Sequence, residues 1–134
     1  MECSIKNLSK YRFESSVEAL EDARIMYHAG RYKNALNRAY YSIFHSLRSV
    51  NVLDGFDSSK HSGVIAYFNQ NYVKMGVFPK EISKFIKVAS EKRESADYLD
   101  FFVASKEEAY LQMKRAQTVQ EWIKAYLKDK GILD

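Results

Sequence analysis

The amino-acid sequence predicts an all-α protein, an antiparallel bundle of about five helices. Its 134 residues suit a single domain with a single core. One proline and five glycines leave few helix breakers. Apolar residues recur at three- and four-residue spacings, and no segment alternates as a strand would. We therefore expect residues 1–134 to form one helical domain.

The first two helices are predicted at residues 8–28 and 32–50. Gly30 ends the first helix, because glycine readily adopts the left-handed conformation that follows a helix end. The connection is short, so the two helices are expected to pack as an antiparallel pair. The core-facing stripe of the first helix is predicted to consist of Tyr11, Val17, Leu20, Ala23 and Tyr27.

A shorter third helix is predicted at about residues 59–70, with Ser58 or Ser59 as its N-cap. His61 falls in its first turn, near the positive end of the helix dipole. This position disfavours a protonated imidazole and suits an anion held by the helix end and a neutral His61. The alternative is a surface histidine with a local hydrogen bond.

The last two helices have clear start signals. Pro79 suits the first position of a fourth helix, because its missing N–H has no partner there in any helix. The run 98–103 fits either a loop or a continuation of that helix. Ser105 and Glu108 have the form of a capping box, which predicts a fifth helix over about 106–130.

The second helix carries a polar stripe on an otherwise apolar surface. Tyr41 lies three residues after Arg38 and His45 seven after it, so the three side chains share one helix face. Such a stripe faces either a cleft or a partner. The alternative is structural, with Arg38 in an ion pair and His45 a hydrogen-bonded core histidine.

Positive charge is concentrated in the middle of the sequence. Residues 23–80 hold eight bases and two acids, whereas residues 1–22 hold three bases and five acids. All three histidines lie in the basic segment. An anionic ligand is favoured if these bases share a face, and they are ordinary solvated charges if they do not.

Several classes of chemistry have no support in the sequence. The three histidines are 17 and 16 residues apart, with no spacing typical of metal ligands, so we expect no metal and no cofactor. Cys3 is the only cysteine, which excludes an internal disulfide. No apolar run is long enough for a membrane helix, and the N-terminus lacks a signal-peptide core. We therefore expect a cytoplasmic protein.

Three sequence blocks together carry a family resemblance. They are Asn-Arg-Ala-Tyr-Tyr-x-x-Phe-His at 37–45, Lys-His-Ser-Gly-Val at 60–64 and Arg-x-x-x-Asp-Tyr at 93–98. In this order they resemble the HEPN superfamily (higher eukaryotes and prokaryotes nucleotide-binding), and within it the small stand-alone prokaryotic proteins. The resemblance spans roughly residues 10 to 130 and implies a HEPN-like helical bundle.

The resemblance also raises the possibility of RNA cleavage. HEPN ribonucleases use an Arg-x4–6-His motif, usually paired across a dimer. Arg93 occupies the equivalent arginine position, but Tyr98 stands where Arg-x4-His would place the histidine. Tyrosine, with an ordinary pKa of about 10, is a poor base at neutral pH. Arg38 and His45 also match the motif literally, so the candidate catalytic residues are Arg93, Arg38 and His45.

Three functional hypotheses follow. The first is a non-catalytic module of a toxin–antitoxin or stress-response system that binds a nucleotide, RNA or a partner protein. In this hypothesis the protein is a homodimer, and the candidate partner protein is a minimal nucleotidyltransferase. The second is a metal-independent endoribonuclease, and the third a purely structural dimerisation domain. The candidate ligand-binding residues are Arg38, Tyr41, His45, His61, Arg93, Asp97 and Tyr98.

Overall fold

The computed structural model describes residues 3–134, which form five α-helices and no strand. This confirms the predicted all-α bundle. A 3₁₀ turn, η1 (Val52–Asp54), follows the second helix, and a π-helical turn, η2 (Asn69–Val73), follows the third. The α-helices are α1 (Cys3–His28), α2 (Tyr32–Asn51), α3 (His61–Phe68), α4 (Glu81–Tyr98) and α5 (Lys106–Asp129).

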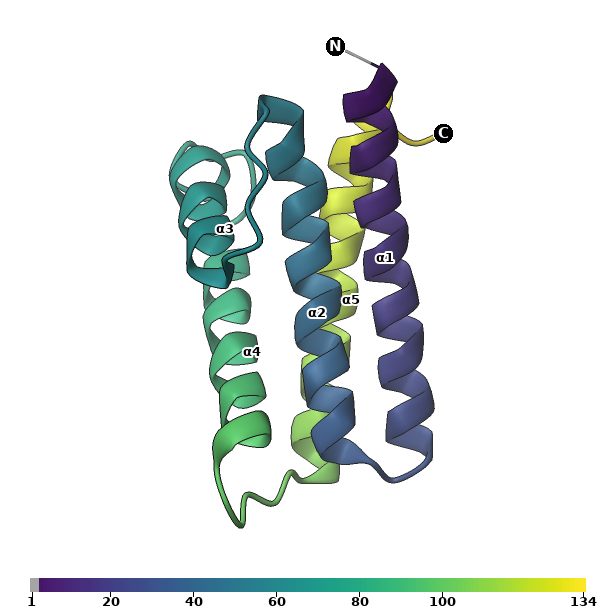
Figure 1. Ribbon diagram of the computed structural model, residues 1–134, viewed down its shortest axis with the longest axis vertical. Coiled ribbons are helices and arrows are strands. Elements are labelled where there is room, and N and C mark those ends of the chain that lie inside the picture. The colour runs from purple at the N-terminus through teal and green to yellow at the C-terminus, as the bar shows by residue number, and fades with distance from the viewer. Residues whose placement is uncertain (1–2) are drawn as a thin grey trace.

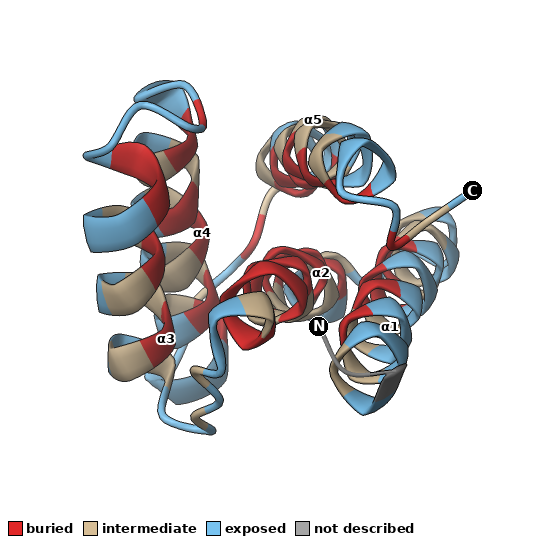
Figure 2. Cartoon of the chain, turned by 90° about the horizontal axis from the view of Figure 1, so that it is seen from above, coloured by how far each residue is buried: buried red, intermediate tan, exposed pale blue. Residues whose placement is uncertain are grey.

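The central element is α2, which packs against all four other helices or the segments next to them (Figure 1). Viewed from above, α1, α4 and α5 surround it, and their buried residues face it (Figure 2). The fully buried side chains on α2 include Leu36, Tyr40, Ile43 and Leu47. Because its apolar faces are covered by neighbours, only the remaining face of α2 can contact a ligand.

Serine residues bring α1 and α2 close together. The hydroxyl of Ser16 donates a hydrogen bond to the Ser42 carbonyl at 2.7 Å, and that of Ser9 to the Ser49 carbonyl at 2.6 Å. The predicted core stripe of α1 is therefore partly wrong. Tyr11 and Val17 are exposed, and the buried face of α1 instead carries these serines together with Phe13, Ala19, Leu20 and Ala23.

Two predicted helix starts also differ from the structure. The helix α3 begins at His61 after Lys60, and neither predicted serine caps it. The Ser58 hydroxyl accepts a hydrogen bond from the Lys60 N–H at 3.1 Å, so it stabilises the turn before the helix. The helix α4 begins at Glu81, and Pro79 lies in the turn that leads into it.

The start of α5 is as predicted. The Ser105 hydroxyl accepts a hydrogen bond from the Glu108 N–H at 3.0 Å. The segment between α4 and α5 is a loop and not a continuation of α4. Its residue Phe101 has a φ of 62° and a side chain that is 99% exposed. A bulky side chain with positive φ is uncommon, because the left-handed region is sterically unfavourable for it.

Within residues 3–134, none of the helices combines the length and the apolar character that a membrane crossing requires.

Candidate functional site

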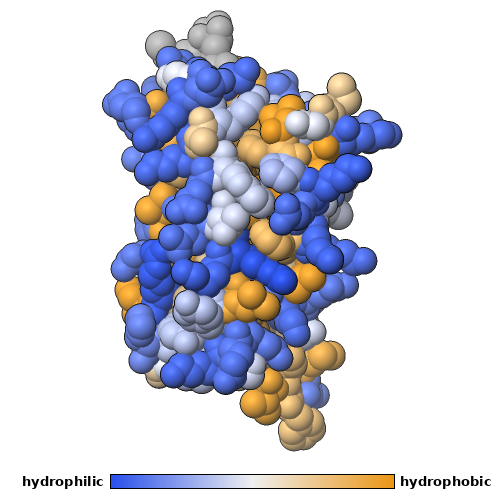
Figure 3. Space-filling view, turned by 180° about the vertical axis from the view of Figure 1, so that it is seen from behind, coloured by the Kyte–Doolittle hydropathy of each residue, from blue (hydrophilic) through white to orange (hydrophobic). Residues whose placement is uncertain are grey.

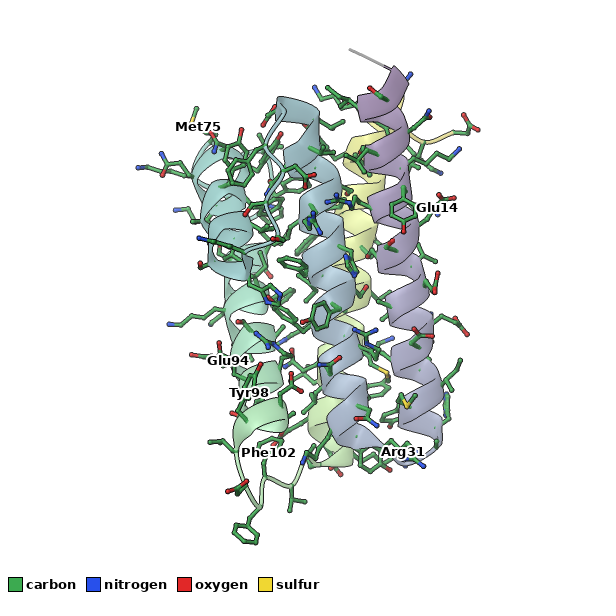
Figure 4. The ribbon with its side chains drawn as sticks, in the orientation of Figure 1. Glu14, Arg31, Met75, Glu94, Tyr98 and Phe102 are labelled. Carbon is green, nitrogen blue, oxygen red and sulfur yellow. The ribbon has the colours of Figure 1, made fainter. Side chains whose placement is uncertain are left out.

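The exposed face of α2 carries a row of polar side chains between α1 and α4 (Figure 4). We call Arg38, Tyr41, His45 and Arg48 the α2 polar stripe. The guanidinium carbon of Arg38 lies 5.0 Å from the ring centroid of Tyr41, and the rings of Tyr41 and His45 are 6.0 Å apart. Arg38, Tyr41 and His45 therefore contact one another in turn along the helix, and Arg48 follows three residues after His45.

A small polar pocket lies between this stripe and α1. It has a volume of about 200 Å³, and Arg38 and His45 both line it. The opposite wall comes from α1 and consists of Tyr11, Ser15, Glu18, Ala19 and Asp22. The pocket therefore has an arginine and an imidazole on one wall and the carboxylates of Glu18 and Asp22 on the other, in a space large enough for a small polar group.

The imidazole of His45 is held neutral. Burial lowers its pKa to about 4, and the neighbouring Arg48, Arg38 and Arg12 contribute further. Its Nδ1 atom is buried and has no hydrogen-bond partner in the protein. An anion bound beside His45 would offset the arginine charges and raise this pKa.

A second histidine lies on the opposite side of the stripe, at the start of α3. The hydroxyl of Tyr40 is 3.0 Å from Nδ1 of His61, and Arg93 Nη2 donates a longer hydrogen bond to the same atom at 3.4 Å. Since arginine only donates, Nδ1 acts as the acceptor and the His61 proton is on Nε2. Burial and the charge of Arg93 lower the pKa of His61.

A polar chain joins α4 to α2. Arg93 is buried, lies over the Tyr40 ring at 5.0 Å and forms an ion pair with Asp97 at 3.6 Å. Asp97 accepts hydrogen bonds from the Asn37 amide at 3.2 and 3.3 Å. The Asn37 oxygen in turn accepts one from Arg38 Nε at 3.2 Å. Burial of Tyr40 raises its pKa to about 12, so its hydroxyl remains a donor.

The predicted site residues fall into two neighbouring groups and one outlier. Arg38, Tyr41 and His45 form the row on α2. The group on α3 and α4 consists of His61, Arg93 and Asp97. The outlier is Tyr98, which is 74% exposed at the end of α4 (Figure 4).

Sequence reasoning missed four residues of this face. Arg48 could have been found, because it continues the stripe three residues after His45. Asn37 and Tyr40 belong to the first sequence block, but the residues that they contact, Asp97 and His61, lie 60 and 21 positions away in the sequence. Arg12 had no sequence signal, since its partner Asp57 is 45 residues away.

Across the described part of the chain, no group of three or more His, Cys, Asp or Glu side chains is arranged to hold a metal ion.

Known proteins resemble this chain over nearly its whole length. The model of the HEPN domain family matches residues 9–126. A UPF0332 protein of Thermotoga maritima is 34% identical over 117 residues, covering 87% of this chain and 79% of the relative. "Putative toxin MJ0142" of Methanocaldococcus jannaschii is 29% identical over 133 residues, covering 99% and 90%. "Putative toxin MJ0605" of the same organism is 31% identical, covering 87% and 86%. With a helical bundle that agrees with this match, the chain belongs to the HEPN domain family.

Proposed function

We propose that this HEPN-domain protein is a non-catalytic binding module that holds RNA or a nucleotide on the α2 polar stripe. The observation that carries the proposal is that Arg38 and His45 line the same pocket beside α2, with Arg48 close enough to His45 to lower its pKa. Arginine binds phosphate through paired N–H groups, and an aromatic ring such as Tyr41 offers a stacking surface for a base.

The charge of this face is permanent at neutral pH. Both histidines have a lowered pKa and are neutral, so the positive charge comes from the arginines. An arginine keeps its proton at any physiological pH. Two relatives carry the name "Putative toxin", which supports a role in a toxin–antitoxin type system, in which a second protein controls the first. We propose a minimal nucleotidyltransferase as that second protein, which co-purification with the tagged chain tests.

Loss of Arg38 is expected to weaken RNA binding. The Arg38→Ala variant should bind a fluorescein-labelled single-stranded RNA oligomer about tenfold more weakly. The slope of log K against the logarithm of the salt concentration should be shallower by about one. Fluorescence anisotropy over a series of salt concentrations measures both. Lys124→Ala is the matched control, because it removes an exposed positive charge from α5. Equal losses in the two variants would show that only net charge matters.

A second candidate function is metal-independent RNA cleavage. It is favoured by the shared pocket of Arg38 and His45, because a neutral imidazole can accept a proton. In this reaction His45 takes the proton of the 2′-hydroxyl, the 2′ oxygen bonds to phosphorus, and the 5′ oxygen leaves with a proton from water. The product is a 2′,3′-cyclic phosphate, and Arg38 would stabilise the negative charge that develops on the phosphorus oxygens.

Incubation with RNA in EDTA separates the two functions. Cleavage that is lost in His45→Ala but not in His28→Ala, a matched exposed histidine on α1, would establish the ribonuclease. Binding without cleavage supports the binding module. A folded sample that neither binds nor cleaves RNA, and that binds no nucleotide, would leave only the structural role.

We also propose that the protein forms a homodimer through the loop between α4 and α5. An apolar cluster projects from this end of the molecule (Figure 3), where Leu99, Phe101 and Val103 are 58%, 99% and 84% exposed. Next to it lies an open pocket of about 440 Å³ whose walls include Arg31 and Lys33. The loop also carries the acidic Asp100. In a two-fold dimer, the acidic, apolar loop of one copy could pack against the basic pocket of the other, and the reverse, so the surface is complementary to itself.

Replacement of Phe101 by aspartate is expected to shift this dimer to a monomer. The change inserts a charge into an apolar contact and adds repulsion beside Asp100. The dissociation constant of the dimer should therefore rise at least about tenfold. Sedimentation equilibrium measures the effect. Met75→Asp is the matched control, since Met75 is 72% exposed in the segment between η2 and α4. A monomeric wild-type protein would refute the dimer.

A further inference from the structure

The loop between η1 and α3 places the carboxylate of Asp57 against two arginines. Both terminal nitrogens of Arg12 donate to it, at 2.9 Å to Oδ1 and 3.2 Å to Oδ2. Arg48 Nη2 donates to Oδ1 at 2.9 Å. One carboxylate thus receives three charge-assisted hydrogen bonds, and this bidentate geometry is the one in which arginine also binds phosphate.

The arginines are more firmly placed than their carboxylate partner. The side chains of Arg12 and Arg48 are 14% and 18% exposed, and both project from long helices. The side chain of Asp57 is 40% exposed and belongs to a connecting loop. The arginine pair would therefore keep its position if Asp57 turned away.

The Asp57 side chain can turn away from the arginines while the backbone of the loop stays in place. Its neighbour Phe56 stacks on the ring of Tyr67 at 4.1 Å, which anchors the backbone beside the arginines. A phosphate would offer the arginines the same charge-assisted hydrogen bonds that the Asp57 carboxylate accepts, so its exchange for Asp57 leaves neither guanidinium unpaired. Rotation of the Asp57 side chain away from the arginines would leave both guanidinium groups open to another anion.

The remaining charge also favours a second anion. Two guanidinium groups face one carboxylate, which leaves an excess of one positive charge at this point. Both arginines act on His45, whose pKa they help to lower, so the pair is continuous with the α2 polar stripe. The Nε atom of Arg48 is buried and has no acceptor in the protein.

We propose that Arg12 and Arg48 form a phosphate subsite, which the carboxylate of Asp57 occupies until a phosphate of the ligand displaces it. The subsite extends the α2 polar stripe beyond His45, so this inference rests on the proposed RNA or nucleotide binding. Asp57 is in this respect an internal competitor: its carboxylate occupies the two guanidinium groups and lowers their affinity for any other anion.

Neutralisation of Asp57 tests the subsite. The Asp57→Asn variant should bind the labelled RNA oligomer about tenfold more tightly than the wild type, with a steeper salt dependence, because two arginines become available to phosphate. Asp57→Glu keeps the competing charge and should not show the gain. Glu121→Gln removes one negative charge from the exposed face of α5 and is the matched control.

The opposite results are also informative. Equal gains in Asp57→Asn and Glu121→Gln would show a general charge effect and overturn the subsite. Weaker binding by a folded Asp57→Asn variant would show that Asp57 positions the arginines for the ligand, which also overturns it. The double variant Arg12→Gln/Asp57→Asn should lose the gain if the arginine pair is the binding site.

A second probe separates this inference from the proposed function. Inorganic phosphate should raise the Tm of Asp57→Asn more than that of the wild type or of the double variant. If this occurs while no variant binds RNA, the subsite stands and the proposed function fails. If the wild type binds RNA and Asp57→Asn shows no gain with either probe, the subsite fails and the proposed function stands. If no variant responds to RNA or phosphate, both fail.

Discussion

Replacement of Arg93 by alanine is expected to lower the free energy of unfolding by about 3 kcal/mol. The Arg93 side chain is 10% exposed and lies over the ring of Tyr40. Its loss would leave Asp97 without its cation and remove a donor from His61. The planar guanidinium also packs against aromatic rings, so the variant loses burial as well as charge.

Urea denaturation measures this change. Lys87→Ala is the matched control, because Lys87 is an exposed cation on the same helix, six residues before Arg93. Its effect should stay within about 0.5 kcal/mol. Arg93→Lys keeps the charge without the planar group and should fall between the two. A loss below about 1 kcal/mol in Arg93→Ala would show that the polar chain from α4 to α2 contributes little to stability.

Lowering the pH from 7 to 4 is expected to destabilise the protein, and His45 alone should account for about 3 kcal/mol. The pKa of His45 is about 4 in the folded chain and about 6.5 in an unfolded one. Between these values the unfolded chain binds a proton that the folded chain does not. The free energy of unfolding therefore falls as the pH falls through this window, and it is independent of His45 above pH 7.

The His45→Gln variant isolates this contribution. Its free energy of unfolding, measured by urea denaturation at a series of pH values, should vary less between pH 7 and 4 than that of the wild type. A residual dependence is expected, because the pKa of His61 is lowered as well. His28→Gln, at the exposed end of α1, should retain the full wild-type dependence. Identical pH profiles for wild type and His45→Gln would mean that His45 titrates normally in the folded chain.

Local signals predicted most of the helices. The capping pair Ser105 and Glu108 defines the start of α5, because one hydrogen bond between neighbours in sequence forms the cap. The register of α1 was predicted less well. Ser9 and Ser16 are fully buried, and a search for apolar residues passes over them. Their hydroxyl groups are acceptable in the core only because carbonyls of α2 accept their hydrogen bonds.

The same distinction applies to the candidate site. The row Arg38, Tyr41 and His45 follows from helix periodicity, and the structure places these side chains together. The contacts of Arg93 with His61 and of Asn37 with Asp97 connect residues 32 and 60 positions apart. No spacing rule links such pairs, since their approach depends on how α2, α3 and α4 pack.

The all-α class, the approximate helix boundaries and the polar stripe of α2 could be predicted from the sequence, because they depend on neighbours within a few turns of one helix. The family was recognised from three ordered blocks of sequence. The sequence did not predict that Asp57 pairs with Arg12 and Arg48, that His45 is half-buried and neutral, or that Phe101 is exposed. Burial, pKa and ion pairing depend on what packs against a side chain, and those neighbours come from distant parts of the chain.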